Sequence, residues 1–308
     1  MPHQIAIVGL GAITQKSHLP AIAANPAFHL VAAASLAGEA PGVPVYRDHH
    51  EMLAAHPEIE AVIINTPPAA RLAIAADVIA AGKHVMLEKP PAATLGGAEH
   101  LVRLAAAAGV VLHTAWHSQY NIAVDRAAEL LAGKRIASLH VDWKEDVHKY
   151  HPGQKWIWGP GGFGVFDMAI NGLSIMSRIF DPVPFVTSAV LRVPADASVP
   201  VSADVTFSDG ADAVMTAAFD WGWRGDDKRE LTIVTTEGQR LELTHSGGRL
   251  VVDGVEVVGA TRTEYRDIYA DFDRLLTERR SRIDLAPLRL VADALLVGRL
   301  DIVAPVMT

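Results

Sequence analysis

The chain has 308 residues, 50% of them hydrophobic and 20% charged, so it is long enough for two domains and too apolar to be disordered. Its formal net charge of −8 argues against a nucleic-acid partner, because neutralising phosphates needs a basic surface. The absence of cysteine excludes disulfides, thiolate nucleophiles and cysteine metal sites. Gly9 and Gly11 interrupt the first apolar run, and no basic segment precedes it, so we expect a cytosolic protein without signal peptide or membrane span.

The first 117 residues alternate short apolar strands with helices. We predict strands over residues 5–8, 28–35, 61–65, 85–87 and 110–114. We predict helices over residues 17–24, 46–55, 69–81 and 95–108. Gly82 and Gly109 predict left-handed helix ends. This alternation predicts an α/β domain over residues 1–117, with a doubly wound parallel sheet covered by helices on both faces.

After residue 117 the pattern changes. Alternating strands are predicted over residues 138–144 and 186–258, with hairpin turns at Gly210, Gly238 and Gly254. Helices are predicted over residues 123–131, 166–179, 264–278 and 287–300. We therefore predict a second, α+β substrate-binding domain over residues 118–308, built on a largely antiparallel sheet, whose last helices can pack back on the first domain.

The turn after the first predicted strand carries a dinucleotide-binding fingerprint with one departure. Gly9 permits the tight turn, and Gly11 lets the backbone approach a pyrophosphate that rests on the N-terminus of the next helix. Thr14 replaces the third glycine, which normally lets the helix pack closely on the strand. We therefore predict a Rossmann domain that binds NADP or NAD. The expected cofactor-binding residues are Gly9, Gly11, Ala12, Ile13, Ser35, Thr66, Pro67, Glu88 and Lys89.

The choice between the two cofactors depends on the end of the second predicted strand. Ser35 and Leu36 stand where an acidic residue normally holds the adenosine ribose hydroxyls. Without the acid a 2′-phosphate is not repelled, and Ser35 can donate a hydrogen bond to it. No arginine lies beside Ser35 in the sequence to neutralise the phosphate. The sequence therefore favours NADP only slightly, and use of both cofactors is plausible.

The segment from His84 to Pro91 is predicted to be a strand that ends in Glu88, Lys89 and two prolines, which prevent its continuation. Open α/β sheets bind their ligands at the carboxyl ends of their strands. We therefore expect Lys89 to reach toward the reacting end of the cofactor. The alternative is that Lys89 is a solvated loop cation.

Asp167 and Asn171 are four residues apart on a predicted helix and share one of its faces. A carboxylate that works with a lysine can deprotonate a sugar hydroxyl. We expect Gly161, Gly162 and Gly164 to let a substrate or a nicotinamide ring approach the backbone. The alternative is that Asp167 caps the helix and Asn171 is an ordinary polar surface residue.

A looser group of polar residues lies between residues 117 and 151. His117, Glu145, His148 and His151 belong to it. We expect no metal site, because histidines three residues apart in a polar loop are usually solvated. Trp143, Trp156 and Trp158 fit either a core or a platform for the face of a pyranose ring. The basic run 278–282 is read as a solvated helix end.

Together these motifs resemble the glucose–fructose oxidoreductase and inositol dehydrogenase family, and the resemblance covers nearly the whole chain. Glu88-Lys89-Pro90 and the helix with Asp167 carry it. Most members have a histidine four residues after the aspartate, where this chain has Asn171. Asparagine is typical of a bacterial subgroup that acts on D-galactose or L-arabinose. Further runs similar to that subgroup are 115–118, 143–146, 151–154, 156–158, 164–167 and 287–293.

The resemblance implies oxidation of an aldopyranose at C1 to a lactone, with hydride transfer to NAD(P)+. In that reaction Asp167 takes the proton, Lys89 stabilises the oxyanion and Asn171 orients a hydroxyl, although the roles of Lys89 and Asp167 can be exchanged. The implied substrate-binding residues are His117, Glu145, His151, Trp158, Asp167 and Asn171. The resemblance also implies a dimer or tetramer of identical subunits.

Two other functions are compatible with the sequence. One is an inositol or other cyclic-polyol dehydrogenase. The other is a non-catalytic sugar or nucleotide sensor on the same fold, which has no need of Lys89 and Asp167 together.

Overall fold

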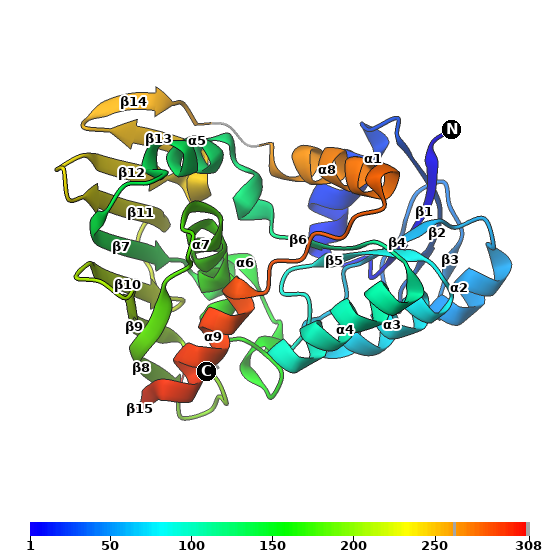
Figure 1. Cartoon of the computed structure of the whole chain (residues 1–308). Coiled ribbons are helices and arrows are strands. Elements are labelled where there is room, and N and C mark those ends of the chain that lie inside the picture. The colour runs from blue at the N-terminus through cyan, green and yellow to red at the C-terminus, as the bar shows by residue number, and fades with distance from the viewer. Residues whose placement is uncertain (261–262, 306–308) are drawn as a thin grey trace. The chain divides into compact units, whose positions relative to one another are not determined.

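The computed structural model describes residues 1–260 and 263–305, and it divides into two compact units (Figure 1). The first unit contains residues 1–117 and 264–285. The second contains residues 118–263 and 286–308, in so far as these are described. The last three residues of the expected second domain, 306–308, lie outside the described residues. None of the described helices has both the length and the apolar character that crossing a bilayer requires.

The first unit is built on a six-stranded parallel sheet with the strand order β3-β2-β1-β4-β5-β6, so the predicted doubly wound sheet is confirmed. Its strands are β1 (His3–Val8), β2 (Phe28–Ala34), β3 (Val45–Tyr46), β4 (Ala61–Ile64), β5 (His84–Glu88) and β6 (Leu112–Ala115). The central strands are buried on both faces, which explains their continuous apolar runs. Their carboxyl ends all lie at one edge of the sheet, where ligands bind in this architecture.

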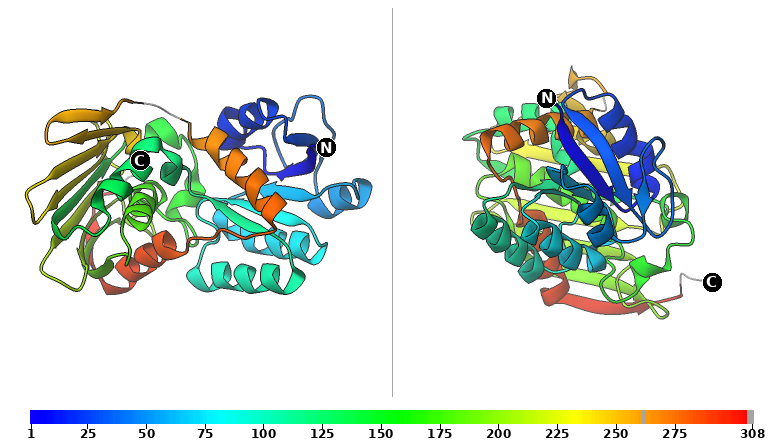
Figure 2. Two further views of the ribbon diagram at one scale, coloured as in Figure 1. Left: turned by 45° about the horizontal axis from the view of Figure 1, so that its top comes forward. Right: turned by 90° about the vertical axis from the view of Figure 1, so that its right-hand side faces the viewer.

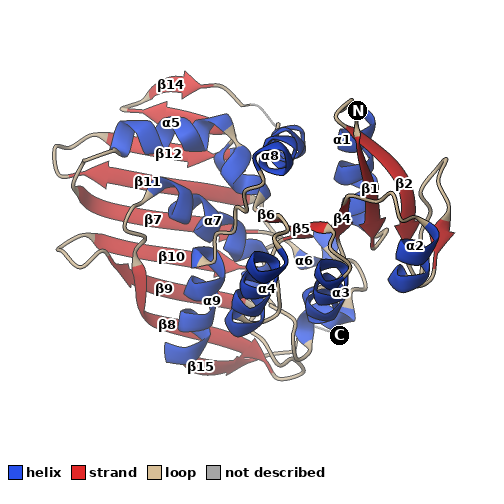
Figure 3. Ribbon diagram, turned by 45° about the vertical axis from the view of Figure 1, so that its right-hand side comes forward, coloured by secondary structure: helices blue, strands red, loops and turns tan. Residues whose placement is uncertain are grey.

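Helices cover both faces of this sheet (Figure 1, Figure 3). The first unit contains η1 (Thr14–His18), α1 (Leu19–Ala23), α2 (His49–Ala55), α3 (Pro68–Ala80), α4 (Leu95–Ala108) and α8 (Glu264–Glu278). α3 and α4 lie on one face, and α1 and α8 on the other. The helix predicted to begin at residue 46 begins at His49 instead. Tyr46 pairs with β2, and the carboxylate of Asp48 caps the helix through the N–H groups of His50 and Glu51.

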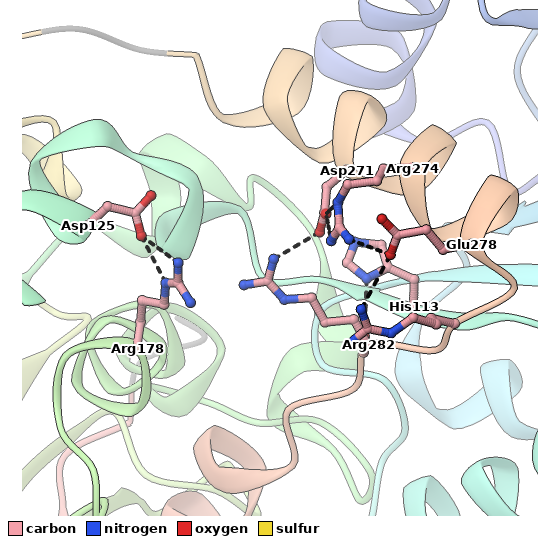
Figure 4. A network of polar contacts seen from close by, with 8 residues as sticks. His113, Asp125, Arg178, Asp271, Arg274, Glu278 and Arg282 are labelled. Atoms are coloured by element: carbon pink, nitrogen blue, oxygen red, sulfur yellow. Dashed lines mark hydrogen bonds and ion pairs between the residues drawn. The ribbon is translucent and has the colours of Figure 1, made fainter.

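Residues 278–281 form the exposed helix end that the sequence predicts, whereas Arg282, the last residue of the basic run, is held at the edge of the sheet. The N–H of Arg282 donates to the carbonyl of Leu112, and its guanidinium pairs with Asp271 at 2.8 Å. The carbonyl of Arg282 is 3.1 Å from the ring of His113, whose pKa burial lowers to about 4 (Figure 4). Arg282 therefore forms an isolated parallel bridge with His113 beside β6.

The second unit is a nine-stranded sheet with the order β14-β13-β12-β11-β7-β10-β9-β8-β15. Its strands are β7 (Ile136–Lys144), β8 (Phe185–Pro194), β9 (Ser202–Ser208), β10 (Val214–Asp220), β11 (Lys228–Thr235), β12 (Arg240–Thr244), β13 (Arg249–Val252), β14 (Val255–Val258) and β15 (Gly298–Val303). Pairs β7–β10 and β8–β15 are parallel and the other pairs are antiparallel, so the largely antiparallel sheet is confirmed. The predicted turns at Gly210, Gly238 and Gly254 all have positive φ.

One face of this sheet is covered by α5 (Ile122–Leu131), α7 (Phe166–Ile179) and α9 (Ala286–Val297) (Figure 2). An ion pair of 2.6 Å between Asp125 and Arg178 joins α5 to α7 (Figure 4). The shorter helices of the unit are η2 (His117–Tyr120, whose first residue belongs to the first unit), α6 (Val147–Tyr150), η3 (Lys155–Trp158) and η4 (His245–Gly247). The helix predicted over residues 287–300 ends at Val297, because the next residues pair with β8 as β15.

Candidate functional site

The turn after β1 has the geometry that a dinucleotide requires. Gly9 has φ +98°, and a Cβ atom there would lie 2.9 Å from the backbone nitrogen of Thr66. No atom lies within 4 Å of the Cβ position of Gly11. Residues Gly11 to Ile13 are exposed at the start of the helical segment that follows. This open turn can receive a pyrophosphate on its backbone N–H groups.

Thr14 explains why the fingerprint lacks its third glycine. Its hydroxyl donates to the carbonyl of Gly9 at 2.7 Å and accepts from the side-chain amide of Asn65 at 3.0 Å. Thr14 is fully buried, so these two bonds tie the turn after β1 to the end of β4. A side-chain hydrogen bond here replaces the close packing that glycine normally allows.

Arg71, which sequence analysis missed, organises the neighbouring strand ends. Its guanidinium donates to the carbonyl oxygens of Thr66, Glu88 and Pro90, and the residue is buried. The hydroxyl of Thr66 and the amide oxygen of Asn65 are buried without a hydrogen-bond partner among the described residues. Buried polar atoms normally have partners. Unsatisfied atoms beside the Gly9 turn fit a site that a polar cofactor completes.

Glu88 is held by a buried network at the end of β5. Its side chain is within hydrogen-bonding distance of His18 (3.2 Å), accepts from the hydroxyl of Tyr265 (2.5 Å) and accepts from the backbone N–H of Lys89 (2.8 Å). Burial alone would raise the pKa of Glu88, but His18, His117 and Tyr265 lower it to about 2. Glu88 is therefore an anion whose second oxygen orients the backbone of the half-buried Lys89.

The end of β2 presents Ser35 with its side chain already engaged. The hydroxyl donates to the carbonyl of Ala37 and accepts from the N–H of Leu10 at 3.2 Å. Leu36 is 78% exposed and offers no charge. A hydrogen bond from Ser35 to a phosphate therefore requires its hydroxyl to leave the carbonyl of Ala37.

In the second unit, Asp167 and Asn171 lie in the first turns of α7. Val165 occupies the N-cap position, so the alternative that Asp167 caps the helix is wrong. The side chain of Asp167 is 9% exposed, and its Oδ2 lies 3.5 Å from Nε2 of His151. Asn171, one turn later, is half-buried. A nearly buried carboxylate next to an imidazole is an arrangement suited to proton transfer.

Two glycines in the loop before α7 are required for packing within the second unit. A Cβ at Gly162 would lie 2.4 Å from the carbonyl oxygen of Ile157, and one at Gly164 would lie 2.3 Å from that of Pro200. Gly162 and Gly164 therefore let the loop pack against its own unit, and the Cβ side of each is closed to a ligand. They still matter for the site, because they set the path of the chain into Asp167.

Glu145 forms a buried ion pair that the sequence did not reveal. Its Oε1 accepts from Nε of Arg229 at 2.7 Å and from the indole N–H of Trp143 at 2.9 Å. The ring of Trp143 packs against α7, where a Cβ at Gly172 would lie 2.9 Å from it. Arg229 also lines a cavity. The other residues that line this cavity are Asp227, Glu230, Thr244, His245 and Ser246.

The remaining aromatic and histidine residues fall into two groups. In the second unit, Trp221 contacts both the ring of His151 (5.1 Å between centroids) and that of Trp158 (5.6 Å). Trp143 is buried in the core, whereas Trp156 is 37% exposed. His117 belongs to the first unit, where its ring stacks on Tyr265 and lies 3.5 Å from the carboxylate of Glu264.

Comparison with known proteins identifies the class. The model of an oxidoreductase family with an NAD-binding Rossmann fold matches residues 3–116. A galactose 1-dehydrogenase of Pseudomonas fluorescens is 41% identical over 298 residues, which make up 96% of both chains. The crystal structure of a D-galactose-1-dehydrogenase from Rhizobium etli has a TM-score of 0.94 at 42% identity, covering 99% of this chain and 98% of that one.

A 3-ketoreductase from Actinomadura kijaniata, solved with NADP and TDP-benzene, has a TM-score of 0.85 at 18% identity and covers 98% of this chain and 100% of its own. At this identity it shows a shared fold alone. The matches and the Gly9 turn define an oxidoreductase with an NAD-binding Rossmann domain. The chain belongs to the glucose–fructose oxidoreductase and inositol dehydrogenase family, and the resemblance seen in the sequence is confirmed.

Proposed function

We propose that this enzyme oxidises an aldopyranose at C1, with D-galactose or L-arabinose as substrate and the lactone as product. The observation that carries the proposal is the relationship to a galactose 1-dehydrogenase over 96% of the chain. The two sugars share the configuration of their ring hydroxyls and differ by one hydroxymethyl group. A site for one therefore suits the other.

The reaction breaks the C1–H bond and the O–H bond of the anomeric hydroxyl and forms the carbonyl of the lactone. The bound nicotinamide supplies the acceptor for the hydride. We assign the proton to Asp167, because this carboxylate is nearly buried and lies 3.5 Å from His151, which can carry the proton onward. Lys89 stabilises the negative charge that develops on oxygen, and Asn171 orients a ring hydroxyl.

Other polar side chains are assigned to the remaining hydroxyls. Glu145 is suited to accept from a hydroxyl, because Arg229 and Trp143 both occupy its Oε1 and hold the carboxylate in place. The rings of His151 and Trp158 both contact Trp221. His151 offers a hydrogen-bonding group to the sugar, and Trp158 offers an apolar ring face. His117 is assigned to the same task from the first unit.

The first unit is assigned to the cofactor. The turn of Gly9, Gly11, Ala12 and Ile13 would hold the pyrophosphate, and the strand ends at Thr66, Pro67, Glu88 and Lys89 would lie along the rest of the molecule. Ser35 presents no acid to a 2′-phosphate. We propose that NADP is accepted at least as well as NAD.

A nicotinamide-absorbance assay over a panel of aldoses and inositols, with each cofactor, tests this function. D-Galactose and L-arabinose should differ modestly in kcat/KM, since one missing group in a pocket is typically worth about 1–3 kcal/mol. D-Glucose should react more slowly, because an inverted ring hydroxyl leaves a buried partner unpaired. NMR of the product should show the lactone before hydrolysis. Preference for myo-inositol would replace this proposal with a polyol dehydrogenase.

We also propose that the enzyme is a cytosolic dimer or tetramer of identical subunits. Apolar side chains on α9 and on the edge strand β15 support self-association, since Leu296, Leu300 and Ile302 are 83%, 62% and 70% exposed. Light scattering after size-exclusion chromatography measures the oligomeric state, and fractionation of the source cells measures the location.

A further inference from the structure

The short edge strand β3 brings an arginine next to Ser35. β2 and β3 are parallel, with Ala34 opposite Tyr46, and the N–H of Ser35 donates to the carbonyl of Tyr46 at 2.8 Å. The residue that follows Tyr46 is Arg47. Ser35 and Arg47 therefore leave the sheet side by side, at its carboxyl edge. They are twelve residues apart in the sequence, which is why the sequence around Ser35 showed no arginine.

Arg47 is not engaged in holding the fold together. It is exposed, and within residues 1–260 and 263–305 its guanidinium has neither an ion pair nor a hydrogen bond. The carboxylate of Asp48, the next residue in the sequence, accepts from the N–H groups of His50 and Glu51 at the start of α2. The guanidinium of Arg47 is therefore available to a ligand.

We propose that Arg47 binds the adenosine 2′-phosphate of NADP and makes this cofactor the preferred one. This inference rests on the cofactor site proposed above and names the residue that distinguishes NADP from NAD there. A guanidinium can donate two parallel hydrogen bonds to a phosphate, and an exposed arginine needs little rearrangement to do so. Ser35 carries no negative charge and therefore does not repel the phosphate. NAD, which has a hydroxyl in that position, gains no ionic contact from Arg47.

Two small probes isolate this contact. Adenosine 2′,5′-bisphosphate and 5′-AMP differ only in the 2′-phosphate, and titration calorimetry measures the affinity of each for the full-length enzyme. In Arg47→Gln, the ratio of the two affinities should fall about 10- to 100-fold from the wild-type ratio, the range expected for a lost hydrogen bond to a charged group. Arg47→Lys should keep part of the preference. The ratio of kcat/KM for NADP and NAD should change in the same direction.

Arg103→Gln is the matched control. Arg103 is exposed on α4 of the same unit, and α4 connects β5 and β6, which lie at the other end of the strand order from β3. This variant removes the same charge and should leave the affinity ratio at its wild-type value. An unchanged ratio in Arg47→Gln, or an equal fall in Arg103→Gln, overturns the assignment of Arg47. If the wild type binds neither probe, the nucleotide site itself is wrong. If the wild type binds the two probes with equal affinity, the nucleotide site is correct but the protein does not recognise the 2′-phosphate, and the assignment of Arg47 is wrong.

Discussion

His18 and Glu88 form a buried pair at the end of β5, with 3.2 Å between Nε2 and Oε1 and side-chain exposures of 0% and 4%. Tyr265 and Tyr269 from α8 complete this cluster through hydrogen bonds to Glu88 and His18. Burial raises the pKa of Tyr265 well above its usual value, and the carboxylate of Glu88 raises it further, so Tyr265 stays a donor. The cluster joins β5, which ends one residue before Lys89, to a helix from far along the chain.

The first prediction concerns the charge of Glu88. Its pKa is about 2 in the folded state against 4.5 in the unfolded chain, so the unfolded state takes up a proton first as pH falls. The stabilisation is complete above pH 4.5, corresponds to about 3 kcal/mol, and is lost as pH falls toward 2. Urea unfolding across this range should show the loss in the wild type and a smaller pH slope in Glu88→Gln. Equal slopes would contradict the assigned charge.

The second prediction concerns the ion pair of Arg229 with Glu145. Arg229→Gln leaves a carboxylate at 8% side-chain exposure without its cation, which should destabilise the enzyme by about 3–5 kcal/mol. Because Glu145 then loses its fixed orientation, KM for the sugar should rise more than kcat falls. The control is Arg240→Gln, which breaks an exposed pair with Glu242 worth at most about 1 kcal/mol. Equal effects of the two variants would show that Arg229 has no special role.

The third prediction concerns the proton acceptor. Asp167→Asn keeps the shape of the side chain and removes its basicity, so kcat should fall by about 10²- to 10⁴-fold. Affinity for 5′-AMP should stay near the wild-type value, because Asp167 lies outside the Rossmann unit. Steady-state kinetics and calorimetry measure the two quantities. A variant that retains most of its turnover would move the role of base to another group.

The fourth prediction concerns Lys89. Lys89→Met keeps most of the aliphatic stem and removes the charge, so it should be as inactive as Lys89→Ala if the ammonium meets the developing oxyanion. The backbone N–H of residue 89, which donates to Glu88, is kept in both variants, so steady-state kinetics compare the two side chains on the same backbone contact. Near-normal turnover of Lys89→Met would restore the alternative of a solvated loop cation.

The fold was predictable where its signal is local. Strands β1, β2, β4, β5 and β6 follow from apolar runs, and Gly82 and Gly109 are helix stops with the expected positive φ. The strand β3 was missed, because Tyr46 was predicted to begin a helix and only its pairing with β2 makes it part of a strand. The strand β15 was missed because its apolar residues continue the pattern of α9, and only pairing with β8, about a hundred residues earlier, makes them a strand.

The candidate site was likewise predictable only at positions whose sequence signal is local. Motif positions such as Gly9 and Lys89 stand at strand ends that the sequence reveals. The side chains that contact the site residues could not be predicted, because Tyr265 and Glu88 are 177 residues apart and Arg229 and Glu145 are 84 residues apart. A tertiary contact of this length leaves no periodic trace in either segment.

The fifth prediction concerns Ser35. Ser35→Asp keeps an acceptor near the N–H of Leu10, which Ser35 now serves at 3.2 Å, and adds a carboxylate at the end of β2. This carboxylate can accept from the ribose hydroxyls of NAD and repels a 2′-phosphate. The kcat/KM ratio of NADP to NAD should therefore fall. Because Arg47 lies next to Ser35, the effects of Ser35→Asp and Arg47→Gln on this ratio should not be additive. Strictly additive effects would mean that the two residues contact different parts of the cofactor.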